Sequence, residues 1–203
     1  MLINSLPLKT STWANRSTTA QAGDLIMITD IGPVDEVFKY NGTRWAPING
    51  QCLLASNNTS VSVTGTTSQT ELGVATIPGG LVSSNGMLEI YCFWSMTNSA
   101  NTKTTRIKLM ETSDPVTGGT SYHGIANSTI LYHQMTVRIH SANSTSSQKG
   151  VGYWQAGGVG SLAQAPVTST YNFSTDKKIQ LTGQLTNTGE TITLRGWRLM
   201  YKE

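Results

Sequence analysis

Charged residues are scarce in this chain, making up 12% of its 203 residues, with 14 lysines and arginines against 11 aspartates and glutamates. The net charge of +3 is scattered and forms no basic run, so we expect no nucleic-acid partner. No apolar run is long enough to cross a bilayer, and the first residues lack the basic and apolar segments of a secretory signal. We therefore expect a protein made in a reducing cytoplasm, without membrane insertion.

Residues that bind metals or carry out catalysis are also few, with two cysteines and three histidines. Cys52 and Cys92 lack the spacing of a metal site, and Cys92 lies in an apolar row that predicts a buried thiol. His133 and His140 have opposite strand parity, so one strand cannot present both on one face. A metal site assembled between subunits at a threefold axis is the alternative. No nucleophile elbow, phosphate loop or dinucleotide glycine pattern occurs.

Paired carboxylates, which glycoside hydrolysis requires, are hard to find. The acidic residues of segment 24–36 lie at predicted turns, where local hydrogen bonding is expected. Glu89 and Glu111 are an alternative pair on neighbouring strands, but we expect Glu89 to meet Arg106 or Lys108 across a hairpin. The sequence therefore predicts no enzyme, with no catalytic, cofactor-binding or metal-binding residues and no cofactor.

Hydroxylic residues and glycine dominate instead, with 30 threonines, 21 serines and 20 glycines. Threonine favours pleated strands, whereas glycine, serine and asparagine favour turns. A helical protein would carry far more glutamate, lysine, leucine and alanine. This composition predicts an all-β chain.

The clearest strand in the sequence spans residues 88–96. Its alternate positions are apolar (Leu88, Ile90, Cys92, Trp94 and Met96), and we expect them to fill the interior of a sandwich. Tyr91 and Phe93 belong to the opposite face, so the strand requires cover on both sides. With the run at 105–109 it resembles a hairpin, and we interpret the pair as an assembly element.

Further alternating runs and turn residues divide the chain into three parts. Residues 1–22 form a polar N-terminal arm, and residues 23–50 form a small β-hairpin module with a tight turn at Asn41-Gly42. Residues 51–203 contain eight or so short strands, a glycine-rich segment at 150–160 whose run 157–160 is predicted to be a flexible surface loop, and a bulge expected at Gly196. These features predict a jelly-roll-like antiparallel sandwich.

Several segments resemble appendage proteins of tailed-bacteriophage virions. The resemblance covers most of the chain from about residue 20, and its motifs lie at 23–32, 40–50, 77–81, 85–88, 94–101 and 181–194. It implies a trimeric β-sandwich head with an N-terminal part that attaches it to the virion. Long tail fibres carry far more shaft than this chain, so the resemblance points to a short fibre, a tail adaptor or a capsid decoration made in the host cytoplasm.

On that basis we predict a structural virion protein that forms a homotrimer and docks on a capsid or tail protein. The predicted virion-attachment residues are Leu2, Leu6, Trp13, Phe38, Tyr40 and Trp45. The predicted trimer contact consists of Met87, Tyr91 and Phe93.

The alternative is a receptor- or glycan-binding module of the tail, whose partner is a host-surface glycan. Tyr153 and Trp154 are the candidate ligand loop for this function, because exposed aromatic side chains beside amides can stack on sugar rings. A polysaccharide depolymerase is a third, less favoured hypothesis.

Overall fold

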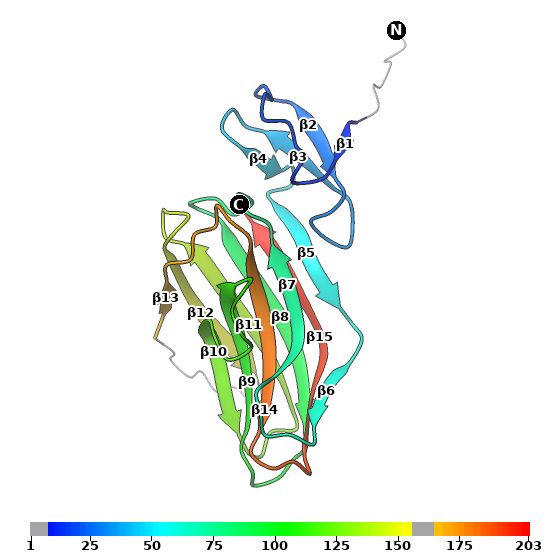
Figure 1. Ribbon diagram of the computed structural model, residues 1–203, viewed down its shortest axis with the longest axis vertical. Coiled ribbons are helices and arrows are strands. Elements are labelled where there is room, and N and C mark those ends of the chain that lie inside the picture. Colours follow the sequence, from blue (N-terminus) through cyan, green and yellow to red (C-terminus); the bar gives the residue numbers. More distant parts are fainter. Residues whose placement is uncertain (1–7, 156–164) are drawn as a thin grey trace.

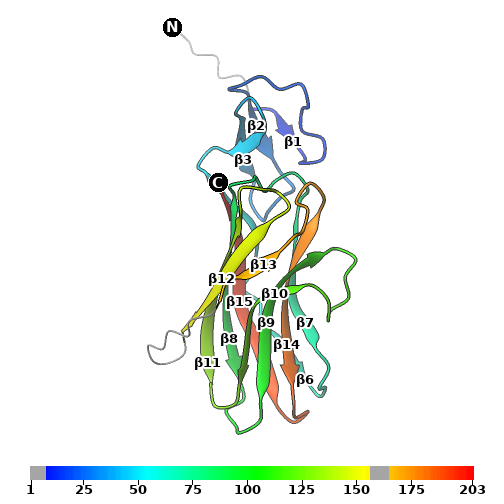
Figure 2. The same ribbon diagram turned by 90° about the vertical axis from the view of Figure 1, so that its left-hand side faces the viewer.

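The computed structural model describes residues 8–155 and 165–203, apart from the side chains of Trp154 and Gln155. Throughout these residues every regular element is a β-strand, so the predicted all-β class is confirmed. Three sheets are present: a small four-stranded sheet at one end, and a four-stranded and a seven-stranded sheet that face each other as a sandwich (Figures 1 and 2). In the described part of the chain, no helix has the length and apolarity needed to span a bilayer.

The small sheet has the strand order β1-β2-β3-β4. Its strands are β1 (Thr10–Ser11), β2 (Leu25–Ile28), β3 (Glu36–Tyr40) and β4 (Trp45–Pro47). β1 comes from the predicted arm and pairs in parallel with β2, whereas the other pairs are antiparallel. Part of the arm is therefore built into the sheet.

The turn between β3 and β4 confirms the expected chain reversal, with a difference in type. Gly42 has φ +99°, but no other residue of this turn has positive φ, so it is not the type I′ turn that Asn-Gly favours. The Asn41 side chain instead accepts hydrogen bonds from the backbone N–H groups of Thr43 and Arg44, each at 3.0 Å. This Asx-type closure stabilises the turn.

The sandwich is jelly-roll-like and antiparallel. One sheet has the order β10-β9-β14-β7, and the other has the order β13-β12-β11-β8-β15-β5, with β6 also paired to β15. The strands of the smaller sheet are β7 (Thr70–Ile77), β9 (Lys103–Glu111), β10 (Thr120–Asn127) and β14 (Lys177–Leu185). Those of the larger are β5 (Gln51–Asn57), β6 (Val61–Thr64), β8 (Met87–Met96), β11 (Tyr132–Ser141), β12 (Gln148–Gln155), β13 (Val167–Ser169) and β15 (Thr191–Lys202).

β8 lies in the middle of the seven-stranded sheet, between β11 and β15. Its inner row is the predicted one, with Leu88, Ile90, Cys92, Trp94 and Met96 all at most 4% exposed. Each large apolar side chain that is buried in this way contributes roughly 1.5–3 kcal/mol to stability. The prediction that this face fills the sandwich is confirmed.

The predicted hairpin between β8 and β9 is wrong. β9 pairs with β10 and β14 in the opposite sheet, and the connection at 97–102 carries the chain from one layer to the other. Strand parity shows which residues share a face, but it does not identify the neighbouring strand. Glu89 consequently meets neither Arg106 nor Lys108.

The surface loop predicted at 157–160 lies outside the described residues. Tyr153 and Trp154 were predicted to lie on a loop, but the segment up to residue 155 is strand β12, paired with β11 and β13. Its glycines have a packing function. A Cβ atom at Gly150 would lie 2.4 Å from the Tyr122 ring, and one at Gly152 would lie 2.5 Å from the His123 ring. Glycine here lets side chains of the opposite sheet approach the backbone. The bulge expected at Gly196 is confirmed by a register shift between Leu194 and Gly196.

Hydrogen bonds tie the small sheet to one end of the sandwich. The Trp13 indole N–H donates to the Gly79 carbonyl at 2.9 Å. The Arg44 guanidinium donates to the Leu81 carbonyl at 2.9 Å and to the Tyr201 hydroxyl at 2.7 Å, and it also pairs with Glu203. Because Arg44 reaches both the connection at 78–86 and the last strand, it joins three segments of the chain.

Candidate binding face of the seven-stranded sheet

The outward-facing residues of the seven-stranded sheet form rows that cross its strands. Thr136 on β11 is paired with Tyr153 on β12 and with Tyr91 on β8, and Tyr91 is paired with Arg198 on β15. Because paired residues project on the same side of a sheet, these side chains share the outer face. Tyr153 is 57% exposed, so this row reaches solvent near its β12 end.

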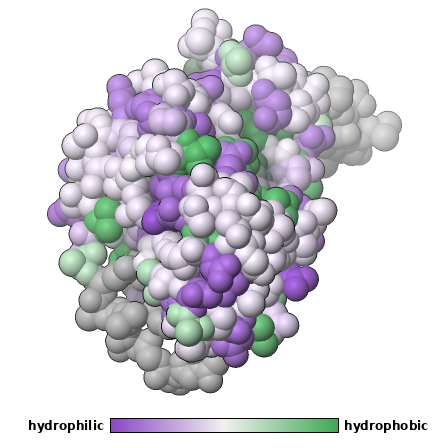
Figure 3. Space-filling view, turned by 60° about the horizontal axis from the view of Figure 1, so that its bottom comes forward, coloured by the Kyte–Doolittle hydropathy of each residue, from purple (hydrophilic) through white to green (hydrophobic). Residues whose placement is uncertain are grey.

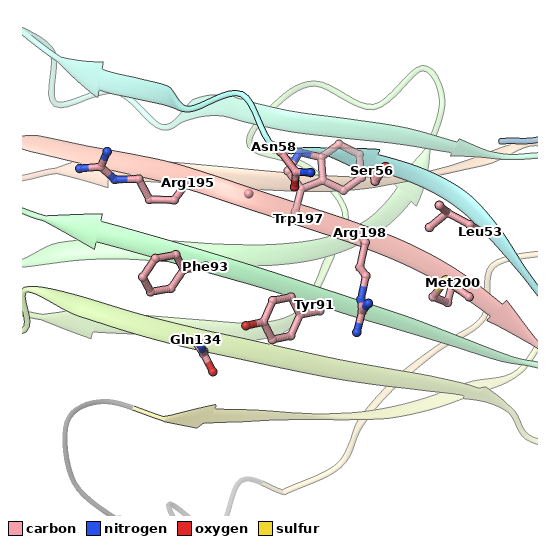
Figure 4. A pocket seen from close by; sticks show the side chains of 11 residues that line it. Leu53, Ser56, Asn58, Tyr91, Phe93, Gln134, Arg195, Trp197, Arg198 and Met200 are labelled. Atoms are coloured by element: carbon pink, nitrogen blue, oxygen red, sulfur yellow. The ribbon is translucent and has the colours of Figure 1, made fainter. Parts of the chain in front are cut away.

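A groove of about 870 Å³ runs over this face. Six side chains give it its chemical character: Asn58, Tyr91, Phe93, Gln134, Arg195 and Arg198. Figure 4 shows Tyr91 and Phe93 next to each other on β8, with Arg195 near the Phe93 end and Arg198 near the Tyr91 end. The volume falls within the range of about 300–1,000 Å³ that is typical of small-ligand sites.

The aromatic side chains of the face are held by their neighbours. Phe93 stacks on Tyr132, with ring centroids 6.0 Å apart and an interplanar angle of 14°. The Arg198 guanidinium lies over the Tyr91 ring, 5.5 Å from its centroid. Cation–π contacts of this kind contribute roughly 0.5–1 kcal/mol at exposed sites. The platform is therefore preorganised within the sheet.

Some charged side chains of this face have a partner of opposite charge, and others do not. Glu89 accepts from Lys202 at 2.9 Å and from Arg138 at 2.8 Å. The hydrogen bond from Lys202, followed by that from Arg138, holds the pKa of Glu89 below its usual range. Among the described residues Arg195 and Arg198 have no carboxylate partner, and Arg195 donates instead to the Ser95 hydroxyl at 2.8 Å. Positive charge is thus in excess along the groove.

The outer face of the four-stranded sheet differs in character. The Lys108 ammonium donates to the Gly118 carbonyl at 2.7 Å, and Lys178 donates to the Thr112 carbonyl at 3.0 Å. Gln180 donates to Glu71 at 2.5 Å. These polar groups are bound by the chain's own 112–118 segment or by each other. Fewer polar groups of this face are available to a ligand than those of the groove.

Seen from the end opposite the small sheet, the surface is mainly polar (Figure 3). Strand β9 begins at this end with the buried Lys103, which donates to the Asn101 carbonyl at 2.7 Å and pairs with Glu190 at 3.3 Å. In this view apolar residues form small separate spots rather than a patch. The aromatic groove on the sheet face is therefore the stronger candidate site.

The predicted attachment residues lie mostly in the interior of the small module. Trp13, Phe38 and Trp45 are at most 5% exposed, and Trp13 packs on Phe38 with ring centroids 5.4 Å apart. Tyr40 is half-buried against Trp45. These side chains hold the module together, so in this conformation the three buried ones are not available as a contact surface. Leu2 and Leu6 lie outside the described residues.

The predicted trimer-contact residues Met87, Tyr91 and Phe93 are half-buried on the outer face, as expected from their parity. Tyr91 and Phe93 line the groove, so the predicted contact and the groove overlap. Tyr153 lies on the same face, on strand β12 rather than on a loop. The Trp154 side chain lies outside the described part of the structure.

The structure corrects the candidate catalytic pair. Glu89 and Glu111 belong to different sheets, and Glu111 pairs with Lys177 at 2.9 Å. None of the described side chains that line the groove is a carboxylate. Burial raises the pKa of both the Cys52 and the Cys92 thiol to about 12, which makes them poor nucleophiles. Over residues 8–155 and 165–203, no cluster of three or more His, Cys, Asp or Glu is suited to a metal ion.

Sequence reasoning did not identify Arg195, Arg198, Gln134 and Asn58 as site residues. A usable signal was present for one of them: Trp197, Leu199 and Tyr201 share an inner face, which places Arg198 on the outer face. The pairing of Arg198 with Tyr91 depends on the β8–β15 register. That register joins residues more than 100 positions apart, and parity within one strand does not reveal it.

Three solved structures to which the chain is similar are all distant. Lectin II from Ulex europaeus has 8% identity and a TM-score of 0.41, covering 75% of this chain and 91% of the lectin. An endo-1,3-β-glucanase from Streptomyces sioyaensis has 11% identity and a TM-score of 0.40, covering 82% and 78%. The CBM2 module of the evolved Dit of Lactobacillus casei BL23 phage J-1 has 10% identity and a TM-score of 0.33, covering 63% and 67%.

With TM-scores this low, these similarities do not indicate a function. The fold is assigned from the strand pairing within this chain. No protein-family model and no curated protein matches the chain.

Proposed function

We propose that this chain is a non-enzymatic virion protein of a tailed bacteriophage that binds a host-surface glycan. The observation that carries the glycan part is the open groove on the outer face of the seven-stranded sheet, with Tyr91 and Phe93 in its floor. The virion part is supported by the resemblance of segments 23–32, 40–50 and 181–194 to phage appendage proteins. Tail fibre, head fibre and capsid decoration are the positions that fit this proposal.

The groove combines the two kinds of contact that sugars require. Aromatic rings offer flat apolar surfaces for the C–H faces of a sugar ring, and amide and hydroxyl groups serve its hydroxyls. The side chains of Gln134, Asn58 and Ser56 line the groove and are exposed to solvent. They are therefore free to bind a ligand.

The small sheet is the proposed attachment part of the molecule. It lies at one end of the sandwich, away from the middle of the seven-stranded sheet (Figure 1). Three large apolar side chains on this sheet or next to its strands are exposed: Leu25 by 43%, Val34 by 53% and Ile48 by 52%. We propose these, in place of the buried Trp13, Phe38 and Trp45, as contacts to a capsid or tail protein. Attachment there leaves the groove facing solvent.

The glycan function is tested by binding to a panel of immobilised bacterial polysaccharides. We expect the wild-type chain to bind at least one member, and Tyr91→Ala to weaken that binding by roughly tenfold, since one buried aromatic contact accounts for about 1–2 kcal/mol. Val74→Ala, at a 44% exposed position on the opposite sheet, is the control and should bind as the wild type does. Equal binding by Tyr91→Ala and wild type would refute the proposed site.

The virion location has a separate test, which is labelling of purified phage particles with an antibody raised against the chain. Labelled particles are expected. A chain that stays in the soluble fraction of the lysate contradicts this part of the proposal.

A homotrimer formed through Met87, Tyr91 and Phe93 is the second candidate. The observation in its favour is that these half-buried apolar side chains lie on one outer face, where Leu53 and Met200 also line the groove. Light scattering decides the matter: a trimer has three times the monomer mass of 21.8 kDa, and Tyr91→Ala should lower the measured mass. A monomer at micromolar concentration leaves the face free and rejects this candidate.

A further inference from the structure

We infer that the groove is built for an acidic glycan, one that carries carboxylate groups such as those of uronic or sialic acids. This inference rests on the proposed glycan-binding function and specifies its ligand class. It follows from the placement of Arg195 and Arg198 at opposite ends of the aromatic pair Tyr91 and Phe93 (Figure 4).

Both arginines are exposed and lack a carboxylate partner among the described residues. The guanidinium group presents a rigid fork of donors that matches a carboxylate in a bidentate manner. Arg195 uses its Nε on the Ser95 hydroxyl, which leaves its terminal nitrogens available. Arg198 is oriented by the face of Tyr91 rather than by an anion. The guanidinium groups of both arginines are therefore available to bind an anionic ligand.

The nearest acidic group on this face does not compensate for them. Glu89 is paired with Arg138 and Lys202. It precedes Tyr91 on β8, whereas Phe93 follows Tyr91. The described lining of the groove contains arginine, amide, hydroxyl and aromatic groups but no carboxylate. A neutral sugar would leave both guanidinium groups unpaired under a bound ligand, whereas an acidic sugar would pair them.

The spacing of the arginines matches a chain of sugars better than a single one. They are three residues apart on β15, on either side of the bulge at Gly196, so their Cα atoms are at most about 10 Å apart at roughly 3.3 Å per residue. On the neighbouring strand Tyr91 lies opposite Arg198, and Phe93 lies opposite Gly196. An oligosaccharide placed along this line would stack on the aromatic rings and reach an arginine at either end.

The test uses a panel of immobilised bacterial polysaccharides with neutral and uronic-acid-containing members, each acidic one present also in carboxyl-reduced form. Reduction removes the carboxylate and leaves the sugar ring. We expect binding to acidic members only, and loss of binding on carboxyl reduction. Binding should also weaken as salt is raised.

Arg198→Gln and Arg195→Gln should each weaken binding to an acidic member by roughly tenfold, the effect of losing one charge-assisted hydrogen bond. Arg198→Lys retains the charge but not the fork, and it should fall between wild type and Arg198→Gln. The matched control is Arg106→Gln, which removes an arginine from the opposite sheet and should leave binding unchanged. Thermal melting of each variant checks that it is folded.

The outcomes separate the two proposals. Binding that survives carboxyl reduction, or that is unaffected by both arginine variants, overturns the acidic-glycan inference and leaves the glycan-binding function in place. Failure of the wild type to bind any member overturns the glycan-binding function itself. A bound acidic member that Arg106→Gln weakens as much as Arg198→Gln shows non-specific charge attraction and also overturns the inference.

Discussion

His133 connects the two sheets of the sandwich through its side chain. Its ring stacks on Trp94 with centroids 6.2 Å apart, and its Nε2 lies 3.2 Å from the Thr105 hydroxyl on the opposite sheet. Burial, together with the nearby His123, lowers the pKa of His133 to about 4. A neutral imidazole in this position is compatible with the apolar interior, whereas an imidazolium is not.

This pKa predicts how stability depends on pH. The unfolded chain takes up a proton at His133 near pH 6.5, but the folded protein does so only near pH 4, so stability is lost as pH falls through this interval. Between pH 7 and 5 the free energy of unfolding should fall by about 2 kcal/mol from this residue. Urea denaturation of wild type and His133→Gln measures the effect. The variant should lose less stability over that range, and parallel pH curves would contradict this account.

Single residues also show which side-chain positions could be predicted from the sequence alone. Parity along the chain was sufficient to place Cys92 in the core and Tyr91 on the outer face. It did not pair Trp13 with Phe38, because parity within one segment does not identify the residue against which an aromatic side chain packs. That partner lies 25 residues away and appears only when β1 and β3 enter one sheet.

Strand β12 shows that glycine can have two different structural roles within a strand. Glycine within a strand marks either a weak segment or a close approach of another part of the chain. At Gly150 the approaching group is the Tyr122 ring, and the hydroxyl of Tyr122 hydrogen bonds to Ser169 on β13 at 2.5 Å. The sequence pattern alone does not separate these two roles of glycine, which is why Tyr153 and Trp154 were predicted to lie on a loop.

Gly150→Ala tests the close approach. The added Cβ would lie 2.4 and 2.6 Å from two Tyr122 ring atoms and 2.9 Å from the Arg138 carbonyl oxygen, so the ring or the strand must shift. We expect a loss of about 1–3 kcal/mol in the free energy of unfolding, as for other overpacked cores. The control is Gly189→Ala, at a turn where the nearest atom would be 3.4 Å from the new Cβ. Equal stability of the two variants, measured by thermal or urea denaturation, would show that β12 does not pack as described.

The elements themselves were largely predictable, but their pairing was not. The alternation of apolar residues gives β8 to within one residue, 88–96 against Met87–Met96, because one face of this strand is buried. It does not give the layer crossing between β8 and β9 or the insertion of β8 between β11 and β15. The groove depends on that insertion, so its arginines and amides could not be assembled from the sequence.

At the scale of the whole molecule, the two outer faces of the sandwich differ. One face is covered in part by the chain's own 112–118 segment, and the other carries aromatic and arginine side chains open to solvent. The small sheet lies at one end and is tied in by Arg44 and Trp13. This arrangement separates a proposed attachment end from a proposed binding face, as an appendage protein requires.

The central claim is that the outer face of the seven-stranded sheet binds a glycan. The most direct measurement is a structure of the protein with an oligosaccharide of the acidic polysaccharide that the panel identifies. We predict sugar density over Tyr91, with carboxylates at Arg195 and Arg198. Density at the far-end loops or over the four-stranded sheet, or a second copy of the chain packed on Tyr91 and Phe93, would contradict the account.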